Sequence, residues 1–289
     1  MDLREHRAEN GVVWLESETI SAPGGVAHGF STRLGGVSKG IYSSLNLGHT
    51  RGDNPAAVRE NYRRFCKATG AGRVEDIVIS HQVHGDVIRV CTPEDRGKGL
   101  DRERDYDADG LMTDVPNLPL VIFTADCIPI LFYDPVHRAV AASHAGWRGT
   151  AQAIAAKTVQ RMVEVYGTDP ADMRAAIGPG ISDCCFLTHR DVPEAMLEAL
   201  GDLAKPFICP ADGEERFHVD LKGINAALLR RAGVGQVDIS TDCTGCLREK
   251  YWNHRTTGQS RGSMAAIIMR TETGETELPD KDRKRRAAQ

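Results

Sequence analysis

Three apolar runs follow one another between residues 118 and 146, and they restrict the fold of this chain more than any other feature. The runs read LPLVIFTADC, IPILFYD and AVAASHAG, and they are split by Pro129 and by the turn DPVHR. Short runs of this apolar content, bounded by turn residues, are typical of strands that are buried on both faces. We therefore predict neighbouring strands of a buried sheet in the middle of the chain.

Helix and strand patterns elsewhere indicate the fold class. Three helices are predicted from their capping residues: 151–167 after Thr150, 192–201 after Asp191, and 221–234 after Asp220. Residues 76–90 and 260–271 predict further strands. These strands outnumber what a simple βαβ alternation would give. The predicted fold class is therefore α/β (α+β), a single-domain layered sandwich of mixed β-sheets flanked by helices, and not a Rossmann fold.

The organisation of the chain is simple. Its 289 residues show no internal repeat and no long linker rich in Pro, Gly or Ser. We predict one domain over residues 1–278. Residues 279–289 are charged and nearly free of large apolar side chains, so we predict a disordered charged tail there.

The charge balance argues against a nucleic acid or a membrane surface as partner. The net charge is only −4, with 26% charged residues, so a small-molecule ligand is the better expectation, bound to a monomer or a small homo-oligomer. The N-terminal residues form no apolar signal segment, and no stretch approaches the roughly 18 apolar residues of a membrane span. We expect a cytoplasmic protein whose eight cysteines are reduced thiols.

Histidine and cysteine residues in three separate motifs suggest a metal site. His81 and His84 lie three residues apart in HQVHG, Cys127 ends the first apolar run, and His144 lies in SHAG. Imidazole and thiolate ligands with one position left open to water or substrate are typical of catalytic rather than structural zinc. The spacing leaves an alternative open, in which Cys127 is a small buried hydrophobe and the histidines only pack or form hydrogen bonds.

Other motifs carry weaker signals. DYDADGLMTD imitates a calcium loop, but Pro116 stands where the bidentate glutamate is needed, so we interpret the segment as a polar loop. CTGC places Cys243 and Cys246 at the spacing of a zinc ribbon, which needs a second such pair. Cys184 and Cys185 would point in opposite directions on an extended strand, so we do not expect a joint four-sulfur site.

Two arginines are candidates for binding an anion. Arg33 stands beside a glycine pair in STRLGGVSKG, and Arg148 follows the loop that contains His144. Guanidinium groups and loop amides that converge on a metal site would suit a phosphate or carboxylate co-substrate. The alternative for either arginine is a surface ion pair.

Taken together, the motifs resemble one family. HGFSTRLGGVS, SLNLG, HQVHG, DADGLMTD, TADCIPILFYDP, HAGWRGT, IGPGI and GQSRG run in order from about His28 to Met269, which is nearly the whole predicted domain. They are similar to the motifs of the laccase-domain family, whose members are called polyphenol oxidases, peptidoglycan editing factors and multifunctional purine nucleoside phosphorylases. HAGWRG together with TADC is highly specific to this family.

The resemblance implies a metal site and an activity. In the family, zinc is held by the histidine of QVHG, the cysteine of ADC and the histidine of HAGWRG, which correspond here to His84, Cys127 and His144. The implied fold is a single α/β sandwich. The implied activity is phosphorolysis of adenosine, inosine and methylthioadenosine, with adenosine deamination as a second activity. We expect catalytic roles for His144, Cys127 and Arg148.

Substrate contacts are predicted with less support from the motifs. We expect Arg33, Asn46 and Arg148 to help bind phosphate or sugar. The chain departs from the family pattern at Leu187, where an acidic residue is common, and at Thr256, where an arginine is common. Both departures are expected at the rim of the pocket, where they bear on substrate preference.

Rival functions remain open at the level of sequence. None of the ten histidines forms the HxH pairs of a multicopper oxidase, which argues against true laccase activity and favours zinc over copper. Cys127 and His144 would also suit a cysteine-type amidase or hydrolase that acts on a peptidoglycan precursor. A third alternative is a non-catalytic binding protein, in which His81 completes a structural zinc site.

Overall fold

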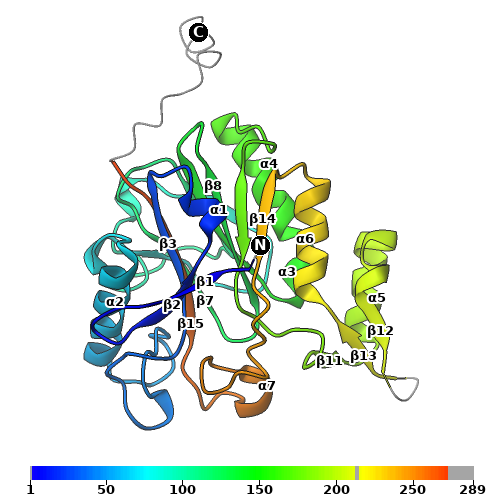
Figure 1. The fold of residues 1–289 in the computed structure, drawn as a ribbon, viewed down its shortest axis with the longest axis horizontal. Helices are drawn as coiled ribbons and strands as arrows, with labels where there is room; N and C mark the ends of the chain where they lie inside the picture. Colours follow the sequence, from blue (N-terminus) through cyan, green and yellow to red (C-terminus); the bar gives the residue numbers. More distant parts are fainter. Residues whose placement is uncertain (1, 212–214, 273–289) are drawn as a thin grey trace, which may run out of the picture.

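Two six-stranded sheets packed face to face dominate the computed structural model, which describes residues 2–211 and 215–272 (Figure 1). The first sheet has the order β1-β2-β3-β15-β7-β4, the second β14-β10-β8-β9-β6-β5, and a small third sheet β11-β13-β12. The strands are β1 (Arg4–Arg7), β2 (Val13–Glu16), β3 (Val26–Ser31), β4 (Val78–Ile79), β5 (Ile88–Val90), β6 (Gly110–Thr113), β7 (Leu120–Thr124), β8 (Ile128–Asp134), β9 (Ala139–Ala145), β10 (Arg174–Ile177), β11 (Leu187–Thr188), β12 (Ile208–Pro210), β13 (Phe217–Val219), β14 (Gln236–Ile239) and β15 (Met264–Arg270).

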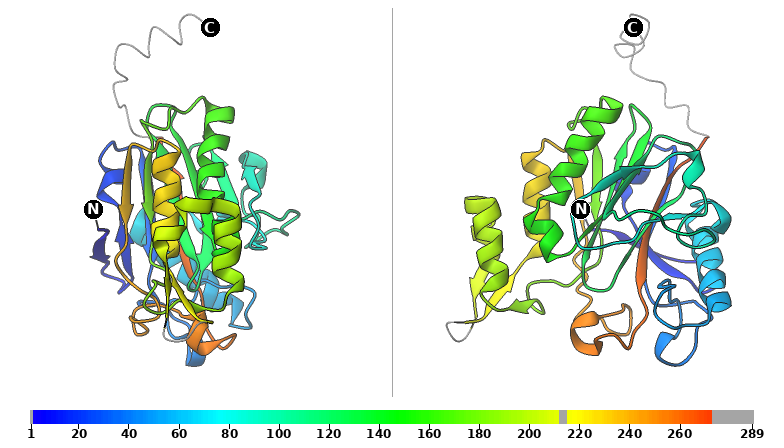
Figure 2. Two further views of the ribbon diagram at one scale, coloured as in Figure 1. Left: turned by 90° about the vertical axis from the view of Figure 1, so that its right-hand side faces the viewer. Right: turned by 180° about the vertical axis from the view of Figure 1, so that it is seen from behind.

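Helices cover the outer face of each large sheet, and further helices lie at the edges and ends of the sandwich (Figure 1). The helices are α1 (Glu18–Ser21), α2 (Pro55–Thr69), α3 (Trp147–Ala151), α4 (Ile154–Tyr166), α5 (Asp191–Leu200), α6 (Leu221–Arg231) and α7 (His254–Thr257). Helix α2 covers the first sheet, and α3, α4 and α6 cover the second, as the two further views confirm (Figure 2). Helix α5 and the third sheet extend beyond this layer (Figure 1).

Alternation along the central strands builds the layers. In β15, Ala266 and Ile268 pack between the two sheets, whereas Ile267 packs on the other side, in the cluster that contains Phe65 of α2. In β9, Val140 likewise packs between the sheets, with its neighbours turned toward α4. Because successive side chains of a strand point to opposite faces, strands covered on both sides are apolar throughout, as these runs are.

Local signals define the helix ends. Asn54 caps α2 by accepting hydrogen bonds from the amides of Ala56 and Ala57, and Gly70 ends the helix with a left-handed conformation. Asp220 caps α6 as predicted, through the amide of Gly223. No helix among residues 2–211 and 215–272 is both long and apolar enough to span a membrane.

The predicted fold class is confirmed, with two corrections. Strands β8 and β9 are neighbours, but β7 belongs to the opposite sheet, because the chain crosses between the sheets at residues 125–127. Thr150 does not cap a single long helix: it is buried inside α3, where its hydroxyl accepts a hydrogen bond from Asn225, and Ala153 adopts a left-handed conformation before α4 begins. The predicted tail, residues 279–289, and the end of the predicted domain lie outside the described residues.

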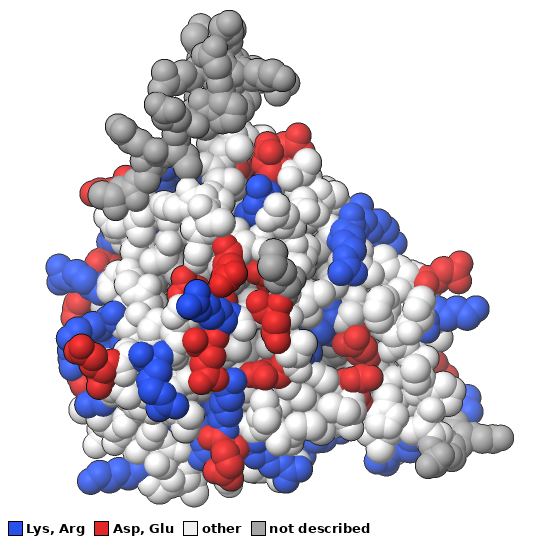
Figure 3. All heavy atoms as spheres, viewed as in Figure 1, with Lys and Arg blue, Asp and Glu red and all other residues white. Residues whose placement is uncertain are grey.

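Charged side chains of both signs are interspersed on the face shown in Figure 3, without a broad field of one sign. Such a surface is compatible with the prediction of a small-molecule ligand. On this one face, the described residues form no continuous basic stripe of the kind that binds nucleic acid.

Removing side-chain volume between the two sheets should be costly. Ile268→Ala is expected to lower the free energy of unfolding by about 2–5 kcal/mol, because a fully buried side chain leaves a cavity. The same change at Ile41, which is 56% exposed, should cost less than about 0.5 kcal/mol. Urea unfolding of the two variants measures both values, and equal losses would contradict this account of the core.

Candidate functional site

Two loops and the end of strand β9 bring His84, Cys127 and His144 together, so His144 lies in a strand rather than in the loop expected from the sequence. His84 lies between β4 of the first sheet and β5 of the second, Cys127 lies where β7 crosses to β8, and His144 lies near the end of β9. One ligand atom from each residue lies within 4.8 Å of the others. The Cys127 Sγ is 3.9 Å from the Nε2 of His84, and the two imidazole rings meet edge to face at 4.8 Å.

Asp109 orients two of these residues. Its fully buried carboxylate lies 2.8 Å from Nδ1 of His144 and accepts hydrogen bonds from the amides of Val83, His84 and Gly85 at 2.8–3.0 Å. Because Nδ1 of His144 donates to this carboxylate, its Nε2 is free to act as a ligand. Asp109 was predicted only as part of a polar loop, although both the imitation of a calcium loop and the family motif DADGLMTD contain it.

Asp126 holds the turn that carries Cys127. Its backbone has φ of 83°, a conformation that residues other than glycine seldom adopt. The carboxylate accepts hydrogen bonds from the Thr244 hydroxyl at 2.6 Å, from the Asn253 side chain at 2.5 Å and from the Arg255 amide at 2.7 Å. The segment between residues 243 and 255 therefore fixes the position of the thiol.

The thiol and the imidazole polarise each other. Burial would raise the pKa of Cys127, but the charge of His144 and hydrogen bonds from His144 and His84 reverse this and lower it to about 6. Burial would lower the pKa of His144, but the Cys127 thiolate and Asp109 raise it to about 9. Without a metal, the pair is therefore a thiolate and an imidazolium at neutral pH.

The donor set fits a divalent metal ion. Two imidazole nitrogens and one thiolate, held by buried partners, suit tetrahedral zinc with one position left for a ligand. Gly146 makes room for this set, because a Cβ there would lie 3.0 Å from the His84 ring and 3.1 Å from the Cys127 sulfur. His81 is not part of the group: its Nδ1 lies 2.7 Å from Asp107 instead.

Two cavities meet at these residues. The first, here called the arginine cavity, has a volume of about 420 Å³, and Arg51, Arg104 and Arg261 line it together with His144. The second, here called the aromatic cavity, has a volume of about 520 Å³, and its lining includes Trp147, Phe186, Ile181 and Arg148. His84, Ala125, Cys127 and His254 line both. The fourth ligand position therefore faces space on two sides.

The arginine cavity is built to accept a polar ligand. Burial and repulsion from Arg51 lower the pKa of Arg261 to about 10. The guanidinium is still charged at neutral pH, and a bound anion would stabilise that charge. Neither ring nitrogen of His49 has a hydrogen-bond partner among the described residues, and burial, with repulsion from Arg104, lowers its pKa to about 4. A neutral, unpartnered imidazole in a cavity wall offers one donor and one acceptor.

The other predicted residues lie at different distances from the cavities. Arg148 stacks on Trp147, 4.3 Å from its ring, and lines the aromatic cavity. Asn46 is fully buried behind the arginine cavity, where it accepts hydrogen bonds from the amides of Gly48 and Ser263 in the cavity wall. Arg33 lines neither cavity: its guanidinium donates to backbone carbonyls and stacks on Trp252.

Leu187 and Thr256 also line neither cavity, but each is adjacent in sequence to a residue that lines the aromatic cavity. Leu187 follows Phe186, and Thr256 follows Arg255, whose guanidinium lies 5.2 Å from the Phe186 ring. The sequence did not point to Arg51, Arg104 or His49, because an isolated arginine or histidine carries no spacing signal. Arg261 lies in the GQSRG motif, but no role was predicted for it.

Comparisons with known proteins agree on one family. Residues 27–271 match the sequence profile described as "Multi-copper polyphenol oxidoreductase laccase". The chain is 37% identical over 260 residues to the "Purine nucleoside phosphorylase" of Deinococcus radiodurans, covering 89% of this chain and 93% of that protein. It is 33% identical to "Purine nucleoside phosphorylase YlmD" of Bacillus subtilis, covering 84% and 88% of the two chains. The crystal structure of the Bacillus licheniformis hypothetical protein YfiH superposes with a TM-score of 0.84 at 33% identity, covering 92% and 98%.

Asp109→Asn should weaken metal binding by about 10–100-fold, because an amide cannot accept all the hydrogen bonds that orient His144 and the loop of His84. The matched control is Asp107→Asn, in the same motif. The carboxylate of Asp107 is exposed and pairs with His81, which is not one of the three proposed metal ligands. Competition against a chromophoric chelator gives both affinities. Equal effects in the two variants would remove Asp109 from this role.

Metal-free protein should show an unusually acidic thiol at Cys127. A thiol with a pKa of about 6 is mostly protonated and unreactive below that pH, so its alkylation rate should rise through pH 6 and level off near pH 7. An ordinary cysteine continues to gain reactivity up to about pH 8.5. Iodoacetamide labelling followed by mass spectrometry of the Cys127 peptide measures this profile. A rate that still climbs between pH 7 and pH 8 would contradict the prediction, and added zinc should suppress the labelling.

Proposed function

Because the chain belongs to the multi-copper polyphenol oxidoreductase laccase family, we propose that it is a zinc-dependent purine nucleoside phosphorylase with adenosine deaminase as a second activity. The names of its relatives from Deinococcus radiodurans and Bacillus subtilis support the first activity. The observation that carries the proposal is the placement of His84, Cys127 and His144 between a cationic cavity and an aromatic one.

Phosphate is assigned to the arginine cavity. Arg51, Arg104 and Arg261 converge there, and charge-assisted hydrogen bonds from guanidinium groups are the usual means of holding phosphate oxygens. His49 supplies a neutral donor to the same ligand. Asn46 would not contact the phosphate. It would act indirectly, by holding Gly48 and Ser263 of the cavity wall in position through hydrogen bonds.

The purine base is assigned to the aromatic cavity. Trp147 and Phe186 offer ring faces for stacking, and Arg148 and Arg255 offer donors at the edge of the base. With phosphate in one cavity and the base in the other, the ribose C1′ lies beside Cys127 and His144. An oxygen of the phosphate then bonds to C1′ while the bond from C1′ to the purine nitrogen breaks.

Zinc would be held by His84, Cys127 and His144, and would supply a Lewis acid that also lowers the pKa of a water molecule. Asp109 keeps His144 in the tautomer that leaves Nε2 free for this role.

For deamination, adenosine would place its C6 rather than C1′ beside the three ligands. Contact of Arg33 with phosphate or sugar would require its release from the carbonyls of Ser43 and Arg248.

A cysteine-type amidase acting on a peptidoglycan precursor is the second candidate, and one observation favours it. Cys127, His144 and Asp109 form a chain of nucleophile, base and orienting carboxylate, with the pKa of the thiol lowered to about 6. A thiolate bound to zinc is a poor free nucleophile. Stoichiometric zinc therefore favours the phosphorylase, whereas metal-free active protein that loses activity when Cys127 is alkylated favours the amidase.

Copper chemistry has less support than zinc. Two histidines and one cysteine also occur in blue-copper sites, so the donor set alone does not select the metal. A multicopper oxidase needs a further copper cluster bound mainly by imidazoles. Within residues 2–211 and 215–272, the only other group of close metal ligands consists of four cysteines, without a histidine. We therefore propose zinc as the metal at His84, Cys127 and His144.

The assay for phosphorolysis is the release of hypoxanthine from inosine. We expect release only when phosphate is present. His144→Ala should lower the activity by at least about 100-fold, because loss of a metal ligand should cost more than loss of the residue that orients it. His189→Ala, at an exposed histidine outside both cavities, is the control and should keep full activity. Release without phosphate, or an active His144→Ala variant, would refute the proposal.

A further inference from the structure

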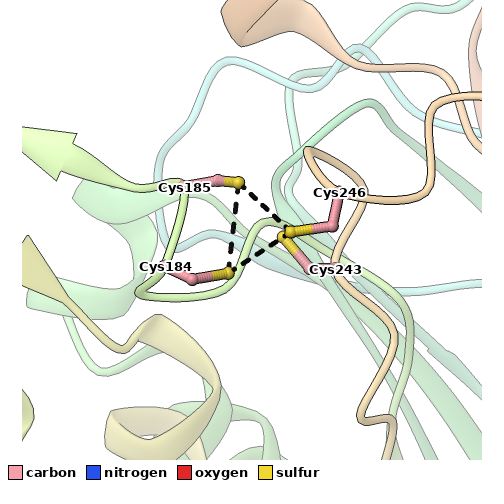
Figure 4. Close-up of side chains that lie close together, drawn as sticks. All are labelled: Cys184, Cys185, Cys243 and Cys246. Carbon is pink, nitrogen blue, oxygen red and sulfur yellow. Dashed lines mark hydrogen bonds between the residues drawn. The ribbon is translucent and has the colours of Figure 1, made fainter.

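Four cysteines outside the catalytic candidate site converge on one point (Figure 4). Cys184 and Cys185 approach Cys243 and Cys246, and the four sulfur atoms all lie within 4.8 Å of one another. The sequence analysis did not expect this arrangement, because adjacent residues on a strand point apart. Cys184 and Cys185 instead lie in a tight turn, in which the amides of Cys185 and Phe186 both donate to the Ser182 carbonyl, and both thiols face the same side.

The distances between the sulfur atoms match a tetrahedral metal site. Zinc bound to four thiolates at about 2.3 Å requires neighbouring sulfurs to be about 3.8 Å apart. The sulfur of Cys184 lies 4.0 Å from that of Cys185 and 3.6 Å from that of Cys246, and the Cys185 and Cys246 sulfurs are 3.5 Å apart. A disulfide would need about 2.05 Å, and all four cysteines are free.

The surroundings favour a thiolate and a close approach. The backbone amide of Ser182 donates a hydrogen bond to the Cys243 sulfur at 3.3 Å. Amides that point at a sulfur stabilise metal-bound thiolates. Gly245 is required here, since a Cβ would lie 2.7 Å from the Cβ of Cys185.

A buried cation offsets part of the negative charge of this group. Lys222 is 5% exposed and interacts electrostatically with Cys243 and Cys184. Its ammonium group donates to the carbonyls of Ser240 and Asp242, just before the CTGC motif. Four thiolates around a divalent ion carry a net charge of about −2, which a neighbouring ammonium stabilises.

We propose that Cys184, Cys185, Cys243 and Cys246 bind a second zinc ion in a closed, structural site. Four protein ligands leave no position for water or substrate, in contrast to the three ligands of the other site. The proposal does not depend on the nucleoside activity proposed above.

The second site connects two segments that wall the aromatic cavity. Phe186 follows Cys185 directly and lies against Arg255, which belongs to the segment that begins at Cys243. Thr244, between the two cysteines of CTGC, donates to Asp126, the residue before Cys127. Zinc at the four cysteines therefore holds the turn that carries Cys127, as well as two lining residues of the cavity.

The decisive protein is Cys127→Ser in the full chain, purified without added metal. This variant lacks one ligand of the three-ligand site, but elemental analysis should still find about one zinc per chain. X-ray absorption should show that this zinc has four sulfur neighbours near 2.3 Å. Absence of this zinc, iron in its place, or nitrogen neighbours would overturn the proposal. So would a mass measurement under non-reducing conditions that reveals a disulfide among the four cysteines.

Two further variants complete the test. Cys246→Ser should lose about one zinc relative to the unaltered protein, because a serine hydroxyl replaces the thiolate poorly as a ligand. Cys209→Ser, at an exposed cysteine outside the cluster, is the matched control and should keep the full zinc content. Full zinc content in Cys246→Ser would contradict the proposal. If Cys246→Ser fails to fold, the result for Cys127→Ser still decides the question.

Discussion

The buried carboxylate of Asp109 is the contact on which the candidate site depends. It lies just before β6 and joins the loop that contains His84 to the imidazole of His144, through hydrogen bonds of 2.8–3.0 Å. A buried carboxylate is tolerated only when its oxygens are satisfied, and here three amides and one imidazole satisfy them. The same bonds that stabilise the charge therefore fix the imidazole of His144 and the backbone of the loop that carries His84, which brings both ligands close to the position of a metal.

The packing of two sheets explains why the site lies at one end of the sandwich. The chain crosses from the first sheet to the second at 80–87 and again at 125–127, and both crossings leave short polar loops beside the end of β9. Loops can adopt conformations that strands cannot, and both His84 and Asp126 have positive φ. The rigid apolar layers then hold these loops in place, which suits a site that must keep its geometry during a reaction.

The two proposed metal sites would have different roles, one in the reaction and one in stabilising the structure. The group of His84, Cys127 and His144 opens onto two cavities, whereas the four-cysteine group is closed and lies behind one cavity wall. Asp126 links them, since it precedes Cys127 and accepts a hydrogen bond from Thr244. In the proposed function, the arginine cavity would bind the anion and the aromatic cavity the planar base.

The sequence by itself determined the local structure and the identity of the main motifs. The three central apolar runs, the cap at Asp220 and the fold class follow from periodicity and capping, which act over a few residues, while the choice of His84, Cys127 and His144 followed from motif resemblance. Only the tertiary structure decided that β7 lies in the opposite sheet, that Asp109 meets His144, and that Cys184 and Cys185 meet Cys243 and Cys246. These contacts join residues far apart in the chain, and they depend on how whole layers pack, a property that no short window of sequence contains.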